Sequence, residues 1–305
     1  MRYLGIGKEP SYGTQVNAQY YIPIIEESLK LEQNYIYPET VAYREHDKAI
    51  AGKKSVSGGW EQYVNYDNIG LILKAALGSE TKSNPTIGVA KHEFKRTSSI
   101  PSLTILVGLD DITEKVFTGV GINELKLELL AGEILKCSVD CIGRDQIIGN
   151  LSNPTFSNQD FIDASRVISF KLDDIDVKPE RFSITIRNNI EDAYVLGSIL
   201  LQGLEASLFE VEGEFDVKFS STDHLNDFLN SNHKDLMIKF QGNLIASGYY
   251  YELQIDCDEI VYDAYEASIN KKERIVENLK FRAIRASVSD EPIIITLQNA
   301  QDVEY

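Results

Sequence analysis

The 305-residue sequence has no long apolar stretch and few cysteines, and both absences exclude whole classes of protein. It contains no run of about 18 apolar residues, so we expect no membrane-spanning helix. The first residues, MRYLGIGKEPSYG, lack the apolar core of a signal peptide. Three cysteines do not make a disulfide framework, and Cys137 and Cys141 lie about 13 Å apart on one predicted strand. We expect buried free thiols in a reducing compartment.

Basic residues are also scarce. Lys and Arg number 30 against 47 Asp and Glu, which gives a formal charge of −17 at pH 7. A protein that binds in a DNA groove neutralises phosphates with surplus Lys and Arg, so this composition argues against that mode of binding. Composition alone leaves two explanations open: the charge keeps the protein soluble, or it forms a surface that lies near nucleic acid without adhering to it.

Motifs that carry catalysis are missing as well. The stretch Ala51–Ser55 is similar to part of a phosphate-binding loop, but Asp47 and Lys54 replace residues that the motif requires. The glycine pair at 119 and 121 lacks the third glycine of a dinucleotide site. No histidine or acidic cluster has metal-ligand spacing; the sets considered are His46, His92, His224, His233, 173–176 and 256–259. The sequence predicts no enzyme, no cofactor and no metal site.

The clearest local pattern is residues 54–79, KSVSGGWEQYVNYDNIGLILKAALGS. Side chains alternate up to position 64, with Trp60 on the face that we expect to be buried, and a period of two indicates a strand. Asp67 and Asn68 then offer N-cap chemistry to an apolar helix, which Gly78 is placed to end. The segment predicts a strand followed closely by a short helix.

The same unit recurs at residues 210–229, EVEGEFDVKFSSTDHLNDFL. Gly213 takes the place of Gly58, an offset of 155 residues, which is about half of the chain. One face of the strand is apolar, the other is acidic, and a short helix follows. A repeat at half-length predicts two copies of one module, residues 1–150 and 151–305, rather than an array of short repeats.

The other segments fit a mainly β fold. In the first copy we expect an irregular arm (1–20), a strand (22–32), a long connection (33–53), a weakly periodic segment with one short strand (79–101), a strand turning near 108–111, a hairpin (125–141) and a linker (143–165). In the second we expect strands near 182–186, 236–240, 251–257, 275–284 and 293–297, and a long connection (188–208). Each module is predicted to be a β-sandwich or partly closed barrel with one short helix and a long inter-strand loop.

Three segments together resemble the tail tube proteins of long-tailed bacteriophages and prophages: residues 54–79, the hairpin LKLELLAGEILKCSVDCIGRD, and SITIRNNIEDAYVLGS in the second half. The resemblance covers most of residues 9–300 and is closest to the duplicated type. It implies a structural virion protein, the major tail tube protein, whose copies stack as rings into a hollow tube that conducts phage DNA from the capsid to the host.

The resemblance also implies how copies assemble. In the family, inner sheets join between subunits into one barrel and single-module members form hexameric rings, so a duplicated chain implies a pseudo-hexameric ring of three subunits. The implied partners are further copies, the tape measure protein, the tail terminator and baseplate proteins, while double-stranded DNA passes through the lumen without specific binding. The implied location is the virion tail, assembled in the bacterial host cytoplasm.

Two sets of residues are predicted to serve this role. Wet faces of alternating strands are predicted to line the channel, because an acidic wall repels phosphate, and some basic residues are expected to form cross-strand ion pairs. These lumen residues are Lys126, Glu128, Lys136, Asp140, Glu210, Glu212, Glu214, Asp216, Glu252, Asp256, Lys280 and Arg282. The long loops are predicted to contact another ring or subunit through Tyr35, Tyr37, Tyr43, Tyr194, Leu196, Leu200 and Leu201.

Three alternatives stay open at the level of sequence. A tail completion or baseplate hub protein can share the tube fold. A tandem β-sandwich that binds carbohydrate or acts as an adhesin would display an exposed aromatic platform, whereas Trp60, the only tryptophan, lies on a face that we expect to be buried. A hydrolase acting through paired carboxylates is the least supported, because no two are placed at a working separation.

Overall fold

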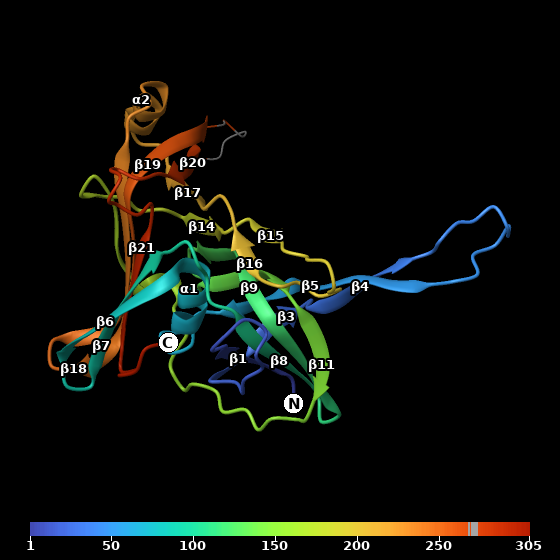
Figure 1. Cartoon of the computed structure of the whole chain (residues 1–305). Helices are drawn as coiled ribbons and strands as arrows, with labels where there is room; N and C mark the ends of the chain where they lie inside the picture. Colours follow the sequence, from blue (N-terminus) through green and yellow to red (C-terminus); the bar gives the residue numbers. More distant parts are fainter. Residues whose placement is uncertain (268, 270–273) are drawn as a thin grey trace.

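One antiparallel sheet, which we call the long sheet, runs through both halves of the chain. The computed structural model describes residues 1–267, 269 and 274–305 and has the mainly β fold that the sequence predicts (Figure 1). In spatial order the long sheet contains β4 (Lys30–Ile36), β5 (Ile50–Tyr63), β10 (Lys136–Gly143), β9 (Thr113–Leu130), β14 (Arg181–Arg187), β17 (Glu210–Lys218), β20 (Val276–Ala283) and β19 (Tyr249–Ala267). Pairing of β9 with β14 joins the two halves.

Further strands form an outer layer in each half. In the first half they are β1 (Tyr3–Lys8), β2 (Tyr20–Ile22), β8 (Leu103–Leu109) and β11 (Asp145–Gly149); in the second they are β12 (Val167–Leu172), β13 (Ile175–Asp176), β18 (Lys234–Ala246) and β21 (Ile294–Asn299). The remaining strands are β3 (Ile24–Glu27), which pairs with β5, the hairpin of β6 (Gly78–Thr86) and β7 (Val89–Arg96), and the small pair of β15 (Ile190–Asp192) and β16 (Leu204–Ala206).

The core forms because each strand of the long sheet has one apolar face. Leu125, Leu127 and Leu129 of β9 are buried, while Lys126 and Glu128 between them are half-exposed. Burying one leucine contributes about 1.5–3 kcal/mol, more than the roughly 0.2–1 kcal/mol of an exposed ion pair. The apolar faces therefore hold the layers together, and the three cysteines lie among them as buried free thiols, as expected.

Strand pairings of the first half recur in the second with the same register. Leu31 faces Val56 between β4 and β5, and the pair 155 residues later, Ile186 and Val211, face each other between β14 and β17. The two longest strands, β9 and β19, run from the outer layer into the long sheet, and each carries a bulge where it enters that sheet. The extra residue is at position 123 in β9 and at 263, 140 residues later, in β19.

Two helices, α1 (Ile69–Leu77) and α2 (Asp223–Leu229), follow β5 and β17 as the sequence predicts. Gly78 ends α1 with a φ of 101°, a conformation that glycine adopts at little cost. The entry to α1 differs from the prediction. Asn65 Oδ1 accepts hydrogen bonds from the backbone N–H groups of Asp67 and Asn68 at 3.1 and 3.0 Å, and the Asn68 side chain makes no capping bond.

Several segments predicted to be irregular are strands. β1 lies within the predicted arm 1–20, and its Leu4 and Ile6 are fully buried. In the weakly periodic segment 79–101, β7 confirms the one short strand expected there, and the unexpected β6 pairs with it as a hairpin. β6 has no apolar alternation because neither of its faces packs deeply into the core, so the pattern that reveals the other strands is absent from it.

The predicted boundaries also move in three places. The strand expected over 22–32 is interrupted at residues 28–29, between β3 and β4, opposite Gly58, whose φ is 100°. β11 occupies the start of the expected linker 143–165. β12, after that linker, had no predicted counterpart, although Phe170 and Leu172 are buried on either side of the half-buried Lys171.

Candidate assembly surfaces

The polar face of the long sheet gathers most of the residues predicted to line a channel. Residues that face each other on neighbouring strands have their side chains on the same face of the sheet. By this register, every predicted lumen residue except Glu252 and Asp256 lies on the polar face. Glu252 and Asp256 lie on the first part of β19, which pairs with β18 and β21 in the outer layer. Glu252 there forms an ion pair with Lys239 at 2.8 Å.

Two arginines of β14, which were not among the predicted lumen residues, bridge the halves on this face. Arg181 Nη2 lies 3.0 Å from Glu128 of β9 and 2.5 Å from Glu214 of β17. Arg187 repeats the arrangement with the next carboxylates on the same two strands, Glu124 at 2.7 Å and Glu212 at 2.5 Å. Each guanidinium therefore fixes the register of three neighbouring strands.

These contacts change how Glu128 titrates. Its partial burial alone would raise the pKa of the carboxyl group, but hydrogen bonds from Lys126 and Arg181 outweigh this effect. The pKa of Glu128 therefore lies below its ordinary value. On the other side of the pair, burial would lower the pKa of Arg181, and the bond to Glu128 raises it instead. Both shifts favour the charged pair.

Cross-strand ion pairs involve two of the basic residues for which they were expected. Lys136 lies 3.5 Å from Glu61 of β5, and Arg282 lies 3.0 Å from Glu210 of β17 and also contacts Glu212. Lys126 instead pairs with Glu128 of its own strand. Much of the acidity of β17 is thus balanced by arginine, although carboxylates still outnumber basic side chains on this face.

Among the described residues, the long sheet has an unpaired edge at each end. β4 pairs through one side with β5, and the end of β19, residues 264–267, pairs through one side with β20. The corresponding strands at the joint between the halves, β14 and the end of β9, are paired on both sides. Unpaired edges of this kind invite another strand.

The end of β4, the start of β5 and the loop between them project as an arm, residues 33–54 (Figure 1). Three of the predicted contact residues, Tyr35, Tyr37 and Tyr43, lie on it and are more than half exposed. The Tyr37 ring contacts His46 of the same arm, with the ring centroids 5.5 Å apart, but these aromatic side chains have no buried core to pack against. Their exposure is typical of a surface that another chain covers.

The other predicted contact residues lie on the hairpin 188–209, which folds back onto the first half. The Tyr194 hydroxyl donates to the carbonyl of Lys54 at 3.0 Å, and Leu200 pairs with the same residue. Leu196 is fully exposed, but Leu201 is fully buried inside the chain. Leu201 therefore cannot contact another subunit in this conformation.

The two helices differ sharply in burial. All of α1 except Lys74 is buried, whereas α2 has no buried residue. Strands β6, β7 and β9 of the first half pack against α1, and the second half completes its cover. Asn188 Nδ2 donates to the carbonyl of Ala76 at 2.9 Å, and the Tyr305 ring lies against Gly70.

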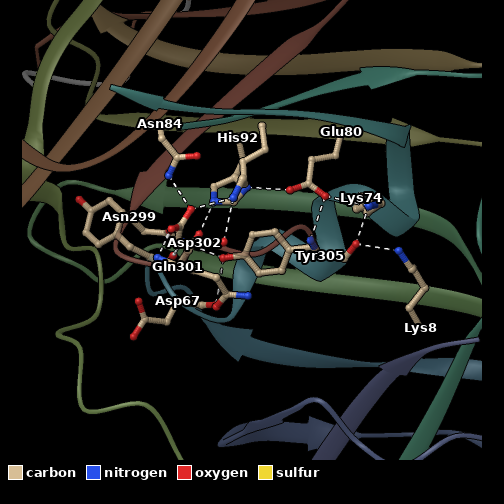
Figure 2. A network of polar contacts seen from close by, with 12 residues as sticks. Lys8, Asp67, Lys74, Glu80, Asn84, His92, Asn299, Gln301, Asp302 and Tyr305 are labelled. Atoms are coloured by element: carbon tan, nitrogen blue, oxygen red, sulfur yellow. Dashed lines mark hydrogen bonds and ion pairs between the residues drawn. The ribbon is translucent and has the colours of Figure 1, made fainter. Parts of the chain in front are cut away.

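A buried polar network holds the C-terminal tail, which ends at Tyr305, against the first half (Figure 2). Glu80 accepts from Lys74 at 2.8 Å, from the Tyr305 backbone N–H at 2.9 Å, and contacts His92 Nδ1 at 2.7 Å. Burial would raise the pKa of Glu80, but the bonds to His92 and Lys74 lower it below its ordinary value. The tail that follows β21 is thus tied to the first half by charged hydrogen bonds.

The part of the chain that the structure describes contains no group of three or more His, Cys, Asp or Glu placed to hold a metal ion. Within that part, no helix is long and apolar enough to cross a membrane. A search of curated proteins finds no match. A family model described as phage tail tube protein matches residues 2–283. The chain therefore belongs to the phage tail tube protein family and is a structural component of the phage tail.

Proposed function

We propose that three copies of this chain close head to tail into a ring and that stacked rings form the major tail tube, which conducts double-stranded DNA from capsid to host. The joint between β9 and β14 carries this proposal, because the open edges of β19 and β4 have the same construction. Residues 1–150 and 151–305 act as two copies of one module. Three chains then supply six similar joints, and the ring closes with pseudo-sixfold symmetry.

The joint inside the chain gives a register for the joint between copies. Lys126 of β9 faces Thr185 of β14, and their counterparts in the other halves are Glu266 and Lys30. Both counterparts are exposed. Opposite charges across antiparallel strands contribute about 0.2–1 kcal/mol and, more importantly, select one register. Next to them, the half-buried Leu31 and Tyr265 would complete the apolar face.

In such a ring the polar face of the long sheet surrounds the channel. Its remaining negative charge repels phosphate, so DNA passes without adhering. The tube would assemble in the host cytoplasm around the tape measure protein, with the tail terminator and baseplate proteins at its ends. The adhesin alternative is disfavoured because Trp60 is 3% exposed and donates to Gln62 Oε1 at 2.8 Å.

Negative-stain electron microscopy of the purified protein tests the proposal. We expect hollow tubes whose end views show threefold symmetry with a sixfold appearance. Single rings that never stack would indicate the tail completion or hub protein instead. Monodisperse monomers at high concentration, under conditions that preserve the fold, would contradict ring formation altogether.

A charge exchange tests the register. Lys30→Glu places like charges opposite each other and should reduce assembly, and adding Glu266→Lys should restore it. The cysteine pair Lys30→Cys with Glu266→Cys should give covalent trimers on oxidation. As a control, Glu32→Cys with Glu266→Cys is displaced by two residues, about 7–8 Å along the diagonal, and should link poorly. Equal yields from both pairs would refute this register.

A further inference from the structure

The hairpin 188–209 shows how one half of this fold is covered by its neighbour. At its start, the backbone N–H of Ile190 donates to Asn123 Oδ1, on the bulge of β9, at 2.9 Å. Further along, the carbonyl of Ile199 accepts from the backbone N–H of Lys54 at 2.7 Å, where β5 begins. The hairpin 188–209 therefore extends from the bulge of β9 at Asn123 to Lys54 of β5.

The arm has the same strand pairing at its base as the hairpin 188–209, but its loop does not pack against the body of the described chain. Ile190 faces Ala206 at the base of the hairpin, and 155 residues earlier Tyr35 faces Ala51 at the base of the arm. The two segments also have equal length, because the offset of 155 residues between the halves is the same before them, at Leu31 and Ile186, as after them, at Val56 and Val211. Yet residues 39–50 are all exposed, and the arm points away from the body of the chain (Figure 1).

The second half has an equivalent surface on which the arm would fit. The counterpart of the bulge at Asn123 is Asp263, and the counterpart of Lys54 is Phe209. Leu208 beside it is 63% exposed. Phe209 also lines an open hollow of about 500 Å³. Arg96 of the first half lies over the Phe209 ring at 5.8 Å, and Arg282, which also lines the hollow, pairs with Asp263 at 3.3 Å. The exposed Leu208 thus forms the apolar rim of a partly charged hollow, and an exposed apolar side chain beside a hollow is typical of a surface that another chain covers.

We propose that, within one ring, the arm of each copy lies across the second half of the neighbouring copy, with Leu208, Phe209 and Asp263 as its seat. This inference rests on the proposed ring, and it assigns the arm to a contact inside the ring, whereas the sequence prediction left open a contact with another ring or with another subunit. The occupant is apolar and aromatic, since the exposed side chains of the arm include Tyr37, Val41 and Tyr43. These groups would bury the seat and lose their own contact with water.

A disulfide distinguishes the two geometries. Leu200 pairs with Lys54 in the seated hairpin, so Glu45 of the arm should lie opposite Phe209 of the neighbour. Paired strands lie about 4.8 Å apart, which is within disulfide reach. On oxidation, Glu45→Cys with Phe209→Cys should give covalent species that stop at three chains. Each copy has one arm and one seat, so contacts inside a ring form a closed cycle, whereas contacts between rings would give a ladder beyond three.

Two variants serve as controls. Glu45→Cys with Ile148→Cys places the second thiol on β11, which is exposed but lies outside the seat, and it should not cross-link. The native cysteines are buried and do not compete. In case Phe209→Cys destabilises the chain, Leu208→Asp leaves the core untouched and should weaken ring formation at least tenfold in protein concentration, whereas Ile148→Asp should not.

The outcomes separate this inference from the proposed function. If the unmodified protein forms neither rings nor tubes, the proposed function fails. If tubes form and the Lys30–Glu266 cysteine pair links three chains, but the arm pair gives a long ladder or no product, the ring stands and the seat is wrong. A normal assembly by Leu208→Asp would likewise overturn the seat.

Discussion

At the scale of single residues, Gly70 shows how tightly the tail after β21 is fitted. A Cβ placed on Gly70 would lie 2.1 Å from the Tyr305 ring, which is far inside van der Waals contact. We predict that Gly70→Ala destabilises the chain by about 1–3 kcal/mol, the usual cost of overpacking. Thermal or urea unfolding measures this. Gly203→Ala, where a Cβ meets nothing within 4 Å, is the control and should change stability little.

Glu128 gives a prediction about pH. Its pKa in the folded chain lies below the value of about 4.3 in the unfolded chain. Its contribution to stability is therefore complete above that unfolded value and is lost as the pH falls through the lower, folded value. Urea midpoints between pH 6 and 3 should fall less steeply for Glu128→Gln than for the unmodified protein. The exposed Glu191→Gln should follow the unmodified curve, and an unchanged slope for Glu128→Gln would contradict the assignment.

At the scale of elements, the sequence predicts those with a strong period and misses those without one. The hairpin around Leu125 and Cys137 and both helices are confirmed: alternation marks the hairpin, and apolar side chains after a polar turn mark the helices, although neither N-cap side chain makes a capping bond. β6 escapes prediction because its side chains are polar on both sides. The ion-pair ladder through Arg181 and Arg187 also escapes, since spacing along one strand does not reveal which strands lie beside it.

The arm is predicted to serve assembly and not folding. Residues 39–50 are exposed, so replacing residues 38–48 with a short glycine turn should change the free energy of unfolding by only about 0.5 kcal/mol. The shortened protein should not form tubes in electron micrographs. Ile87→Asp, at the exposed tip of the β6–β7 hairpin, is a control that should assemble normally. Tubes of ordinary appearance from the shortened protein would refute the role of the arm.

The contrast between the helices predicts a change on assembly. Because α1 is buried, with part of its cover coming from the second half of its own chain, and α2 has no buried residue, amide hydrogen exchange in the monomer should be slow in α1 and fast in α2. In tubes, α2 should gain protection, since the first half of the next copy would then lie beside it. Exchange of α2 that stays equally fast in tubes would mean that the ring joint lies elsewhere.

At the scale of the whole molecule, the formal charge of −17 dominates encounters with nucleic acid. Phosphate contacts need lysine or arginine, and here the arginines of the long sheet are already bound to carboxylates. We predict no measurable retention of double-stranded DNA by purified tubes at about 0.15 M salt. Replacing Glu210 and Glu214 with lysine should produce retention. Binding by the unmodified protein in a gel-shift assay would contradict a non-adhesive channel.

The hairpin of β6 and β7 belongs to only one half of the chain. It extends the outer layer by pairing with β21, whereas only four residues separate α2 from β18 at the matching place. A ring with a nearly sixfold interior would therefore have a threefold exterior, marked every 120°. A protein that binds the outside of the tail at the β6–β7 hairpin would therefore have three binding sites per ring. The positions of these hairpins in successive rings would follow the helical rotation from one ring to the next.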